Sequence, residues 1–357
     1  MVPEMPENTL LNLKRTWDVS EIVTMPGSVA HMLIFEDVLS QIESEGGFED
    51  LVKMLRANIN FGRLGSIGPD LPYYQGVKKT AINFTLLKTG KPAPIETWSD
   101  QLHSKSPNIF PLKMIEIAWR ETILEAPEWD VIANKQWAFI FGFLTHIAAD
   151  QTIHPYVNKI AGQYYREKEN RQKHMSCEAY QDVVLFNNRF QKDIFTEDLK
   201  KWVNISTEPS DMQQYFRGFL EKSFIEAHAI HPSEKDIENW FRGLSFIYSI
   251  MKYYGPYKTA NTDFQTNKEN SAMYKEFLFS VGPTGGTYQD YYTSAVALAL
   301  IYVKAAYRLF DINHADFQDE QRRQFLEIVI NADLVNPLDN NILFDATNAY
   351  RKYFGNK

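Results

Sequence analysis

The stretch between residues 134 and 156 limits the possible folds of this chain more than any other feature. Its apolar residues recur at the three- and four-residue spacing of an α-helix, with no alternation typical of a β-strand. They are Trp137, Ala138, Phe141, Leu144, Ile147 and Ala148. The same helical pattern is found in residues 172–185, 212–230, 234–253, 288–309 and 320–331. Ser233 followed by Asp236 is typical of a helix start, and long Val/Ile/Thr alternations are missing. The sequence therefore predicts an all-α protein.

Residues that break helices cluster at 64–72, 88–94, 254–257 and 281–287. The last cluster, VGPTGGT, is expected to be a lid or a connection. It does not fit a phosphate-binding loop, because the pattern GxxxxGK[ST] is absent.

Composition narrows the class of protein. A chain of 357 residues with 44% hydrophobic residues can bury a substantial core. The net charge of −8 disfavours a broad nucleic-acid footprint, although bound divalent cations would offset much of this charge. The single cysteine, Cys177, excludes an intrachain disulfide, and we expect it to be buried without a role in chemistry.

The sequence offers no segment expected to cross a membrane. The N-terminal residues contain no uninterrupted apolar run of the kind found in a signal peptide, and the most apolar run, 295–303, is about half as long as a bilayer span requires. We therefore expect a soluble protein. Its compartment stays open, since export by another route or a trimmed leader would leave the same sequence, and peripheral contact with a membrane is also compatible with it.

Five of the eight histidines lie among acidic residues. His146, Asp150 and His154 follow one another at four-residue intervals, so a helix places all three on one face. Two imidazoles then flank a carboxylate that can bridge two metal ions. His174 and Glu178 repeat the interval on the next predicted helix. Nitrogen and carboxylate ligands without thiolate favour zinc, with manganese or iron as lesser options.

These histidines also allow other interpretations. Each one alone is compatible with a buried, hydrogen-bonded side chain or a surface pair on a helix. The patterns HExxH, Glu-x-x-His and GxSxG are absent, which argues against a zincin protease, a ferritin-like di-iron bundle and a serine hydrolase. His228, His231 and His314 have no carboxylate-rich partner motif, so we expect them to be structural or on the surface.

Five segments resemble the zinc-dependent phospholipase C family, whose fold is shared with the P1-type nucleases. They are MPGSVAHMLIFEDVL, LGSIGPDLPYY, DQLHS, GFLTHIAADQTIHPYV and KHMSCE, in the order found in the family and between about residues 25 and 185. The resemblance implies a multi-helix phospholipase C/P1 nuclease-like bundle. We expect an N-terminal segment at 1–24, a metal-binding core at 25–190, and an additional C-terminal helical region at 191–357 packed on the core.

The resemblance also implies a ligand set for two or three zinc ions. One ion would be held by Asp70, His103 and His146, a neighbouring ion by the bridging Asp150 and by His31, and a third by His154, His174 and Glu178. Two departures from the family pattern stand out. Secreted members begin at a tryptophan whose amino group and carbonyl are ligands, whereas Trp17 here has sixteen residues before it. The interval from Asp150 to His154 is also two residues shorter than in the best-known secreted enzymes.

The activity implied by the resemblance is phosphodiester hydrolysis of the phospholipase C type. A metal-bound hydroxide would attack a phosphodiester of a phospholipid or a related small substrate, with Asp70 orienting or deprotonating the water. Asp70 also fits a turn cap after Pro69. Tyr73 and Tyr74 are candidates to contact substrate, for example a quaternary ammonium group or a base, or they simply pack. Two alternatives are a P1-like nuclease or nucleotidase, and a catalytically altered member that acts as a binding protein.

Overall fold

The computed structural model describes residues 27–75, 97–124, 129–164, 166–203, 210–267, 271–310, 319–335, 337 and 341–355. Within these ranges the chain forms fifteen α-helices and three short 3-10 helices, and it forms no strand. The all-α prediction is confirmed.

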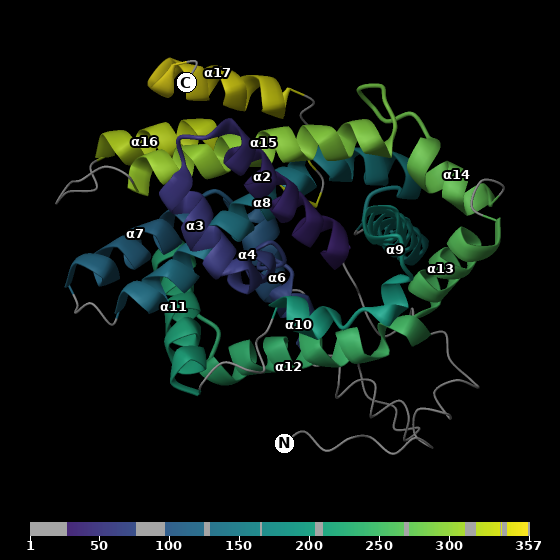
Figure 1. Cartoon of the computed structure of the whole chain (residues 1–357), viewed down its shortest axis with the longest axis horizontal. Helices are drawn as coiled ribbons and strands as arrows, with labels where there is room; N and C mark the ends of the chain where they lie inside the picture. Colours follow the sequence, from purple (N-terminus) through teal and green to yellow (C-terminus); the bar gives the residue numbers. More distant parts are fainter. Residues whose placement is uncertain are drawn as a thin grey trace.

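Helix α8 (Trp129–Ala161) is the centre of the fold (Figure 1). It packs along α15 (Tyr288–Phe310) on one side and α4 (Ile59–Gly65) on another. It also contacts α7 (Ile109–Leu124) and α9 (Lys168–Phe190). Because α8 is covered by several helices, its side chains at residues 137–149 are almost all inaccessible to solvent. A polar group on this helix therefore needs a partner from one of its neighbours.

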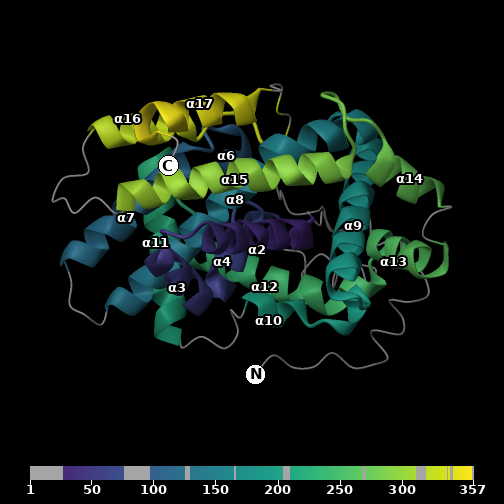
Figure 2. The ribbon, with the colours of Figure 1, turned by 45° about the horizontal axis from the view of Figure 1, so that its top comes forward.

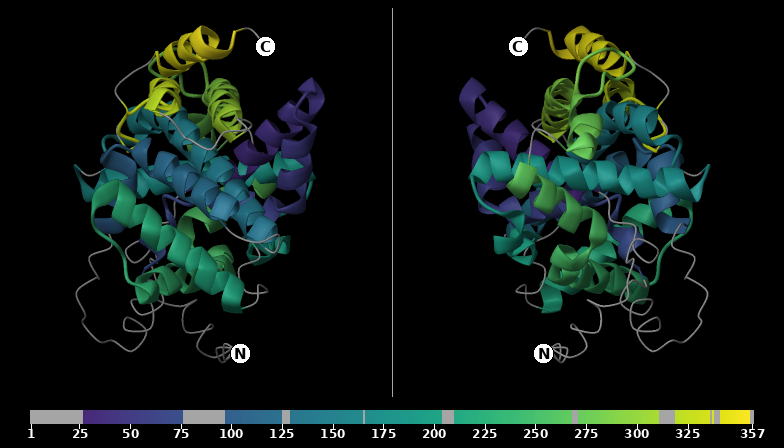
Figure 3. Two further views of the ribbon diagram at one scale, coloured as in Figure 1. Left: turned by 90° about the vertical axis from the view of Figure 1, so that its left-hand side faces the viewer. Right: turned by 90° about the vertical axis from the view of Figure 1, so that its right-hand side faces the viewer.

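The other helices surround this centre (Figures 1 and 2). Two helices flank the outer side of α9, and two others cover α15 near the C-terminus, where Figure 3 shows them at one end of the molecule. The helices beside α9 are α13 (Gly255–Asn267) and α14 (Ala272–Phe279), and those over α15 are α16 (Asp319–Ile328) and α17 (Ile342–Phe354). The bounds of the others are α2 (Ser28–Glu45), α3 (Glu49–Ala57), η2 (Leu71–Tyr74), α6 (Thr97–Ser104), η3 (Ile194–Thr196), α10 (Leu199–Val203), α11 (Ser210–His228), α12 (Glu234–Ile250) and η5 (Met251–Tyr253).

The helices predicted from periodicity are present. The six predicted ranges correspond to α8, α9, α11, α12 continued by η5, α15 and α16, with ends that differ by a few residues. Ser233 begins α12 with a capping box: its hydroxyl accepts from the Asp236 N–H at 3.2 Å, and the Asp236 carboxylate accepts from the Ser233 N–H at 3.0 Å. Residues 281–287 connect α14 to α15 as expected, whereas 88–94 lie outside the described residues.

A crossing of α4 and α8 at glycines brings two backbones unusually close together. A Cβ added to Gly142 would lie 1.9 Å from the carbonyl oxygen of Gly62, and one added to Gly65 would lie 2.0 Å from the carbonyl oxygen of Phe139. Only glycine permits such an approach. The crossing places the turn that follows α4 directly against the middle of α8, and this turn leads to Asp70.

Among the described residues, no helix is both long enough and apolar enough to cross a membrane.

Candidate metal centre

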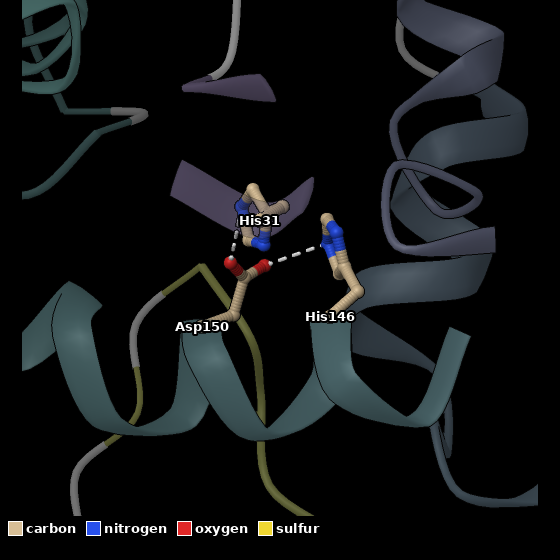
Figure 4. A group of neighbouring side chains, drawn as sticks. All are labelled: His31, His146 and Asp150. Atoms are coloured by element: carbon tan, nitrogen blue, oxygen red, sulfur yellow. Dashed lines mark ion pairs between the residues drawn. The ribbon is translucent and has the colours of Figure 1, made fainter. Parts of the chain in front are cut away.

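The carboxylate of Asp150 lies at the middle of a cluster of imidazoles. Its Oδ2 is 3.1 Å from Nε2 of His146 and 3.6 Å from Nε2 of His103. Its Oδ1 is 3.4 Å from Nε2 of His31 and 3.6 Å from Nε2 of His154. Figure 4 shows Asp150 and His146 projecting from one face of α8 toward His31 on α2. The four-residue spacing therefore places His146 and His154 on either side of Asp150, as predicted, and helices distant in sequence add the imidazoles of His31 and His103.

The eight residues predicted to bind metal come together in three groups, in each of which the potential ligand atoms lie within 4.8 Å of one another. Their side chains are between 0 and 12% exposed. Within them, Asp70 Oδ1 lies 3.2 Å from His103 Nε2, and Glu178 Oε1 lies 3.1 Å from His174 Nε2. The groups are His31, His146 and Asp150; Asp70, His103 and His146; and His154, His174 and Glu178.

Three of the imidazoles donate a hydrogen bond from Nδ1 to a backbone carbonyl. A carbonyl only accepts, so Nδ1 must carry a proton, and Nε2 is the nitrogen that faces the cluster and would bind a metal after losing its own proton. This arrangement is typical of histidines that bind a metal through Nε2. The pairs are His103 with Ser99 at 2.8 Å, His146 with Ser66 at 2.9 Å, and His154 with Leu334.

Several buried polar atoms in the cluster lack a hydrogen-bond partner among the described residues. They include Oδ2 of Asp70, Nδ1 of His31 and Nδ1 of His174. Leaving such atoms unpaired in the interior costs about 1–3 kcal/mol each. A cation among the carboxylates would compensate part of this cost by binding their oxygens. The donor atoms are imidazole nitrogens and carboxylate oxygens, so the residues present fit zinc.

The ionisation of the cluster is strongly perturbed. Burial and the nearby His146 lower the pKa of His31 to about 4. Burial alone would also lower the pKa of His146 and His154, but the negative charge of Asp150 outweighs it and raises these pKa values to about 9 and about 10. Burial would raise the pKa of Glu178, but the imidazoles beside it lower it to about 2. Ion pairs hold the zinc-free cluster together, and a bound metal would displace protons from it.

Asp182 was not predicted from the sequence, yet it positions the helix that carries His31. Its carboxylate accepts from the N–H groups of Val29 at 3.1 Å and Ala30 at 2.7 Å, in the first turn of α2, and also from the hydroxyl of Tyr257. Burial raises its pKa to about 7 despite these bonds. The sequence signal was its spacing, since Asp182 continues the four-residue intervals of His174 and Glu178 along α9.

A pocket opens onto the cluster and is lined by seven of the eight predicted ligands. Tyr73 also lines it, with its ring centroid 5.6 Å from that of His103. Tyr74 is not among the lining residues: its side chain is 1% exposed and packs against α12, where a Cβ on Gly243 would meet its backbone, which fits the packing role that the sequence also allowed. Tyr164, which the sequence did not suggest, lines the pocket with its ring 5.0 Å from that of His174.

The remaining histidines lie elsewhere. His228 stacks on Phe110 with ring centroids 6.0 Å apart, and His231 is exposed beside Glu221. His314 and Trp17 lie outside the described residues, as does the segment 1–24. Cys177 is buried, as expected, and its sulfur accepts from the amide of Gln181.

The sequence profile of the zinc-dependent phospholipase C family matches residues 30–254, which is more than half of the chain. The chain therefore belongs to the zinc-dependent phospholipase C family, a family of hydrolases that act on phosphodiesters. The match extends past residue 185, where the recognised motifs end, so α10, α11 and α12 also fall within it. No curated protein and no solved structure was found to match the chain.

Proposed function

We propose that this chain uses two or three zinc ions to hydrolyse a phosphodiester of a phospholipid or a related small molecule. Family membership supports the class of reaction. The observation that carries the proposal is the position of Asp150, whose carboxylate lies 3.1–3.6 Å from nitrogens of His31, His103, His146 and His154. A buried carboxylate among so many imidazoles is suited to a bridge between two cations.

The proposed division of the ligands follows the three groups. Asp150 would be shared between two ions, because its two oxygens face different imidazoles. The first ion would be held by Asp70, His103 and His146, the second by His31 together with Asp150, and the third by His154, His174 and Glu178. The shorter interval between Asp150 and His154 does not separate His154 from its group, since its Nε2 lies 3.5 Å from Oε1 of Glu178.

Zinc ions, when bound, lower the pKa of water and neutralise phosphate oxygens. The chain itself supplies a proton acceptor and an aromatic side chain in the lining of the pocket. Asp70 lines the pocket, and its Oδ2 has no hydrogen-bond partner among the described residues, so its carboxylate is a candidate to orient a water and accept its proton. The ring of Tyr73 lines the same pocket and is placed to contact a head group, such as a quaternary ammonium.

Three substrates test the proposal on the purified, zinc-loaded protein: a phosphocholine lipid, bis-nitrophenyl phosphate and single-stranded DNA. We expect hydrolysis of the first two, with release of the phosphorylated head group from the lipid, and loss of both activities in Asp70→Asn. His228→Ala is the control, because His228 lies outside the cluster. A zinc-loaded protein inactive on all three would indicate a binding protein, and preference for DNA would indicate a nuclease.

A further inference from the structure

Residues 329–335, called the strap here, lie against the metal centre although they are far beyond the family match, which ends at residue 254. The strap follows α16 and has no regular secondary structure. Its Val329 and Leu334 are fully buried and its Val335 is 4% exposed and lines the pocket. In Figure 4 it is the yellow thread that passes behind Asp150.

One face of α8 binds the strap through side chains. Residues 151, 154 and 158 are spaced by three and four, so they project from the same side of the helix. Each donates to a backbone carbonyl of the strap: Gln151 to Ile330 at 2.7 Å, His154 to Leu334, and Asn158 to Val335 at 2.7 Å. The histidine between the two amides is a predicted zinc ligand.

Leu334 also reaches a second predicted ligand. Its N–H donates to the carbonyl of His103 at 2.9 Å, while its carbonyl accepts from Nδ1 of His154. These histidines belong to different ligand groups. One peptide segment is therefore bonded to a member of each group, and Nε2 of each of these histidines lies 3.6 Å from the carboxylate of Asp150.

A buried tyrosine holds the start of the strap. The hydroxyl of Tyr302, on α15, donates to Oε1 of Gln151 at 2.7 Å and accepts from the N–H of Ile330 at 3.2 Å. Gln151 in turn donates to the carbonyl of Ile330. These three residues form a closed ring of hydrogen bonds, in which Tyr302 and Gln151 are buried and Ile330 is partly buried. At the other end, Asn158 holds Val335.

We propose that the strap is a positioning element of the metal centre, in which Leu334 fixes the tautomer and orientation of His154 and holds it in register with His103. Tyr302 and Asn158 are positioning residues that act through the strap. The inference rests on the proposed function, because it requires His154 to bind zinc. Loss of a partner that orients a metal-binding histidine typically weakens metal affinity about 10- to 100-fold. The strap thus contributes to the centre through its backbone N–H and carbonyl groups.

Two variants test the strap, and the chain offers a matched control. Tyr302→Phe and Asn158→Ala each release one end of it. Tyr292→Phe is the control, because Tyr292 is also buried on α15 and its hydroxyl also donates at 2.7 Å to a side-chain oxygen, that of Asp37. Zinc affinity is measured by chelator competition, cobalt-substituted protein is examined by visible absorption, and unfolding is followed without metal. His154→Ala identifies which zinc depends on that ligand.

We expect Tyr302→Phe and Asn158→Ala to weaken the zinc lost in His154→Ala by about tenfold and to change the cobalt spectrum. Tyr292→Phe should lose stability without a change in zinc affinity. Wild-type zinc affinity and cobalt spectrum in both strap variants, or an equal loss of zinc affinity in Tyr292→Phe, would overturn the inference and leave the proposed function standing. A wild-type protein that binds less than one zinc would overturn the inference together with the proposed function.

Discussion

Replacing Gly142 by alanine tests whether the glycine crossing of α4 and α8 positions the centre. The new Cβ would lie 1.9 Å from the carbonyl oxygen of Gly62 and 2.7 Å from the backbone nitrogen of Ser66. Real Cβ contacts below 3.0 Å are essentially never seen, and backbone atoms cannot rotate away. The two helices must therefore separate by about 1 Å in a close-packed interior.

The expected cost follows from two opposing effects. Overpacking typically destabilises by about 1–3 kcal/mol, and contact with rigid backbone puts this site at about 3 kcal/mol. Alanine is the better helix former by about 1 kcal/mol, so the net loss should be about 2 kcal/mol. Separation also moves the carbonyl of Ser66 away from His146, so we expect Gly142→Ala to bind zinc more weakly as well.

Urea unfolding of the zinc-free protein measures this loss, because bound metal would otherwise add its own stabilisation. Gly218→Ala is the matched control: it is also a helical glycine, on α11, and an added Cβ meets nothing within 4 Å. It should gain about 0.5–1 kcal/mol. If Gly142→Ala unfolds within about 0.5 kcal/mol of wild type, the close crossing does not constrain the fold as described.

Three further predictions concern the metal centre. Asp150→Asn should lower turnover by about several hundredfold, more than any change at a single terminal ligand, because the amide loses the charge that joins two cations; full metal and activity in this variant would place the centre elsewhere. Chelation of zinc should lower the melting temperature, since the metal binds only the folded state, and an unmoved transition after verified metal removal would contradict the ligand set. The pKa values of His146 and His154 are raised from 6.5 to about 9 and about 10, so protonation of these imidazoles stabilises the zinc-free fold. This stabilisation is complete below pH 6.5 and should disappear as the pH rises through 9 and 10. Zinc binding at pH 7.5 should therefore release protons, and a calorimetric enthalpy independent of the buffer would refute the assigned protonation.

Much of the fold could be predicted because helical periodicity is a local property. The ranges with regular apolar spacing became α8, α9, α11, α12, α15 and α16. The crossing at Gly142 could not be predicted, since its glycine partner lies about eighty residues earlier and nothing in the local pattern marks the contact. The role of residues 329–335 was invisible for a related reason: their carbonyls and N–H groups bind the centre, and backbone atoms leave no trace in side-chain motifs.

The candidate site was predictable where ligands share a helix. His146, Asp150 and His154 follow from spacing on α8, and His174 and Glu178 from spacing on α9. The positions of His31, Asp70 and His103 came from resemblance to the family, because each lies on a different element and only the tertiary fold brings it to the cluster. Tyr73 and Tyr74 were both candidates to contact substrate because both follow Asp70 closely, but successive residues of a 3-10 helix point in different directions, and Tyr74 is buried in the core.

The most direct test of the central claim is the zinc content of the purified protein, determined by elemental analysis after gel filtration. The convergence of eight buried nitrogen and oxygen ligands on α2, α6, α8, α9 and the turn after α4 predicts at least two equivalents of zinc per chain. Asp150→Asn should retain markedly less, whereas His228→Ala should retain the wild-type amount. Less than one equivalent of any transition metal in the wild-type protein, after incubation with zinc, would contradict the account.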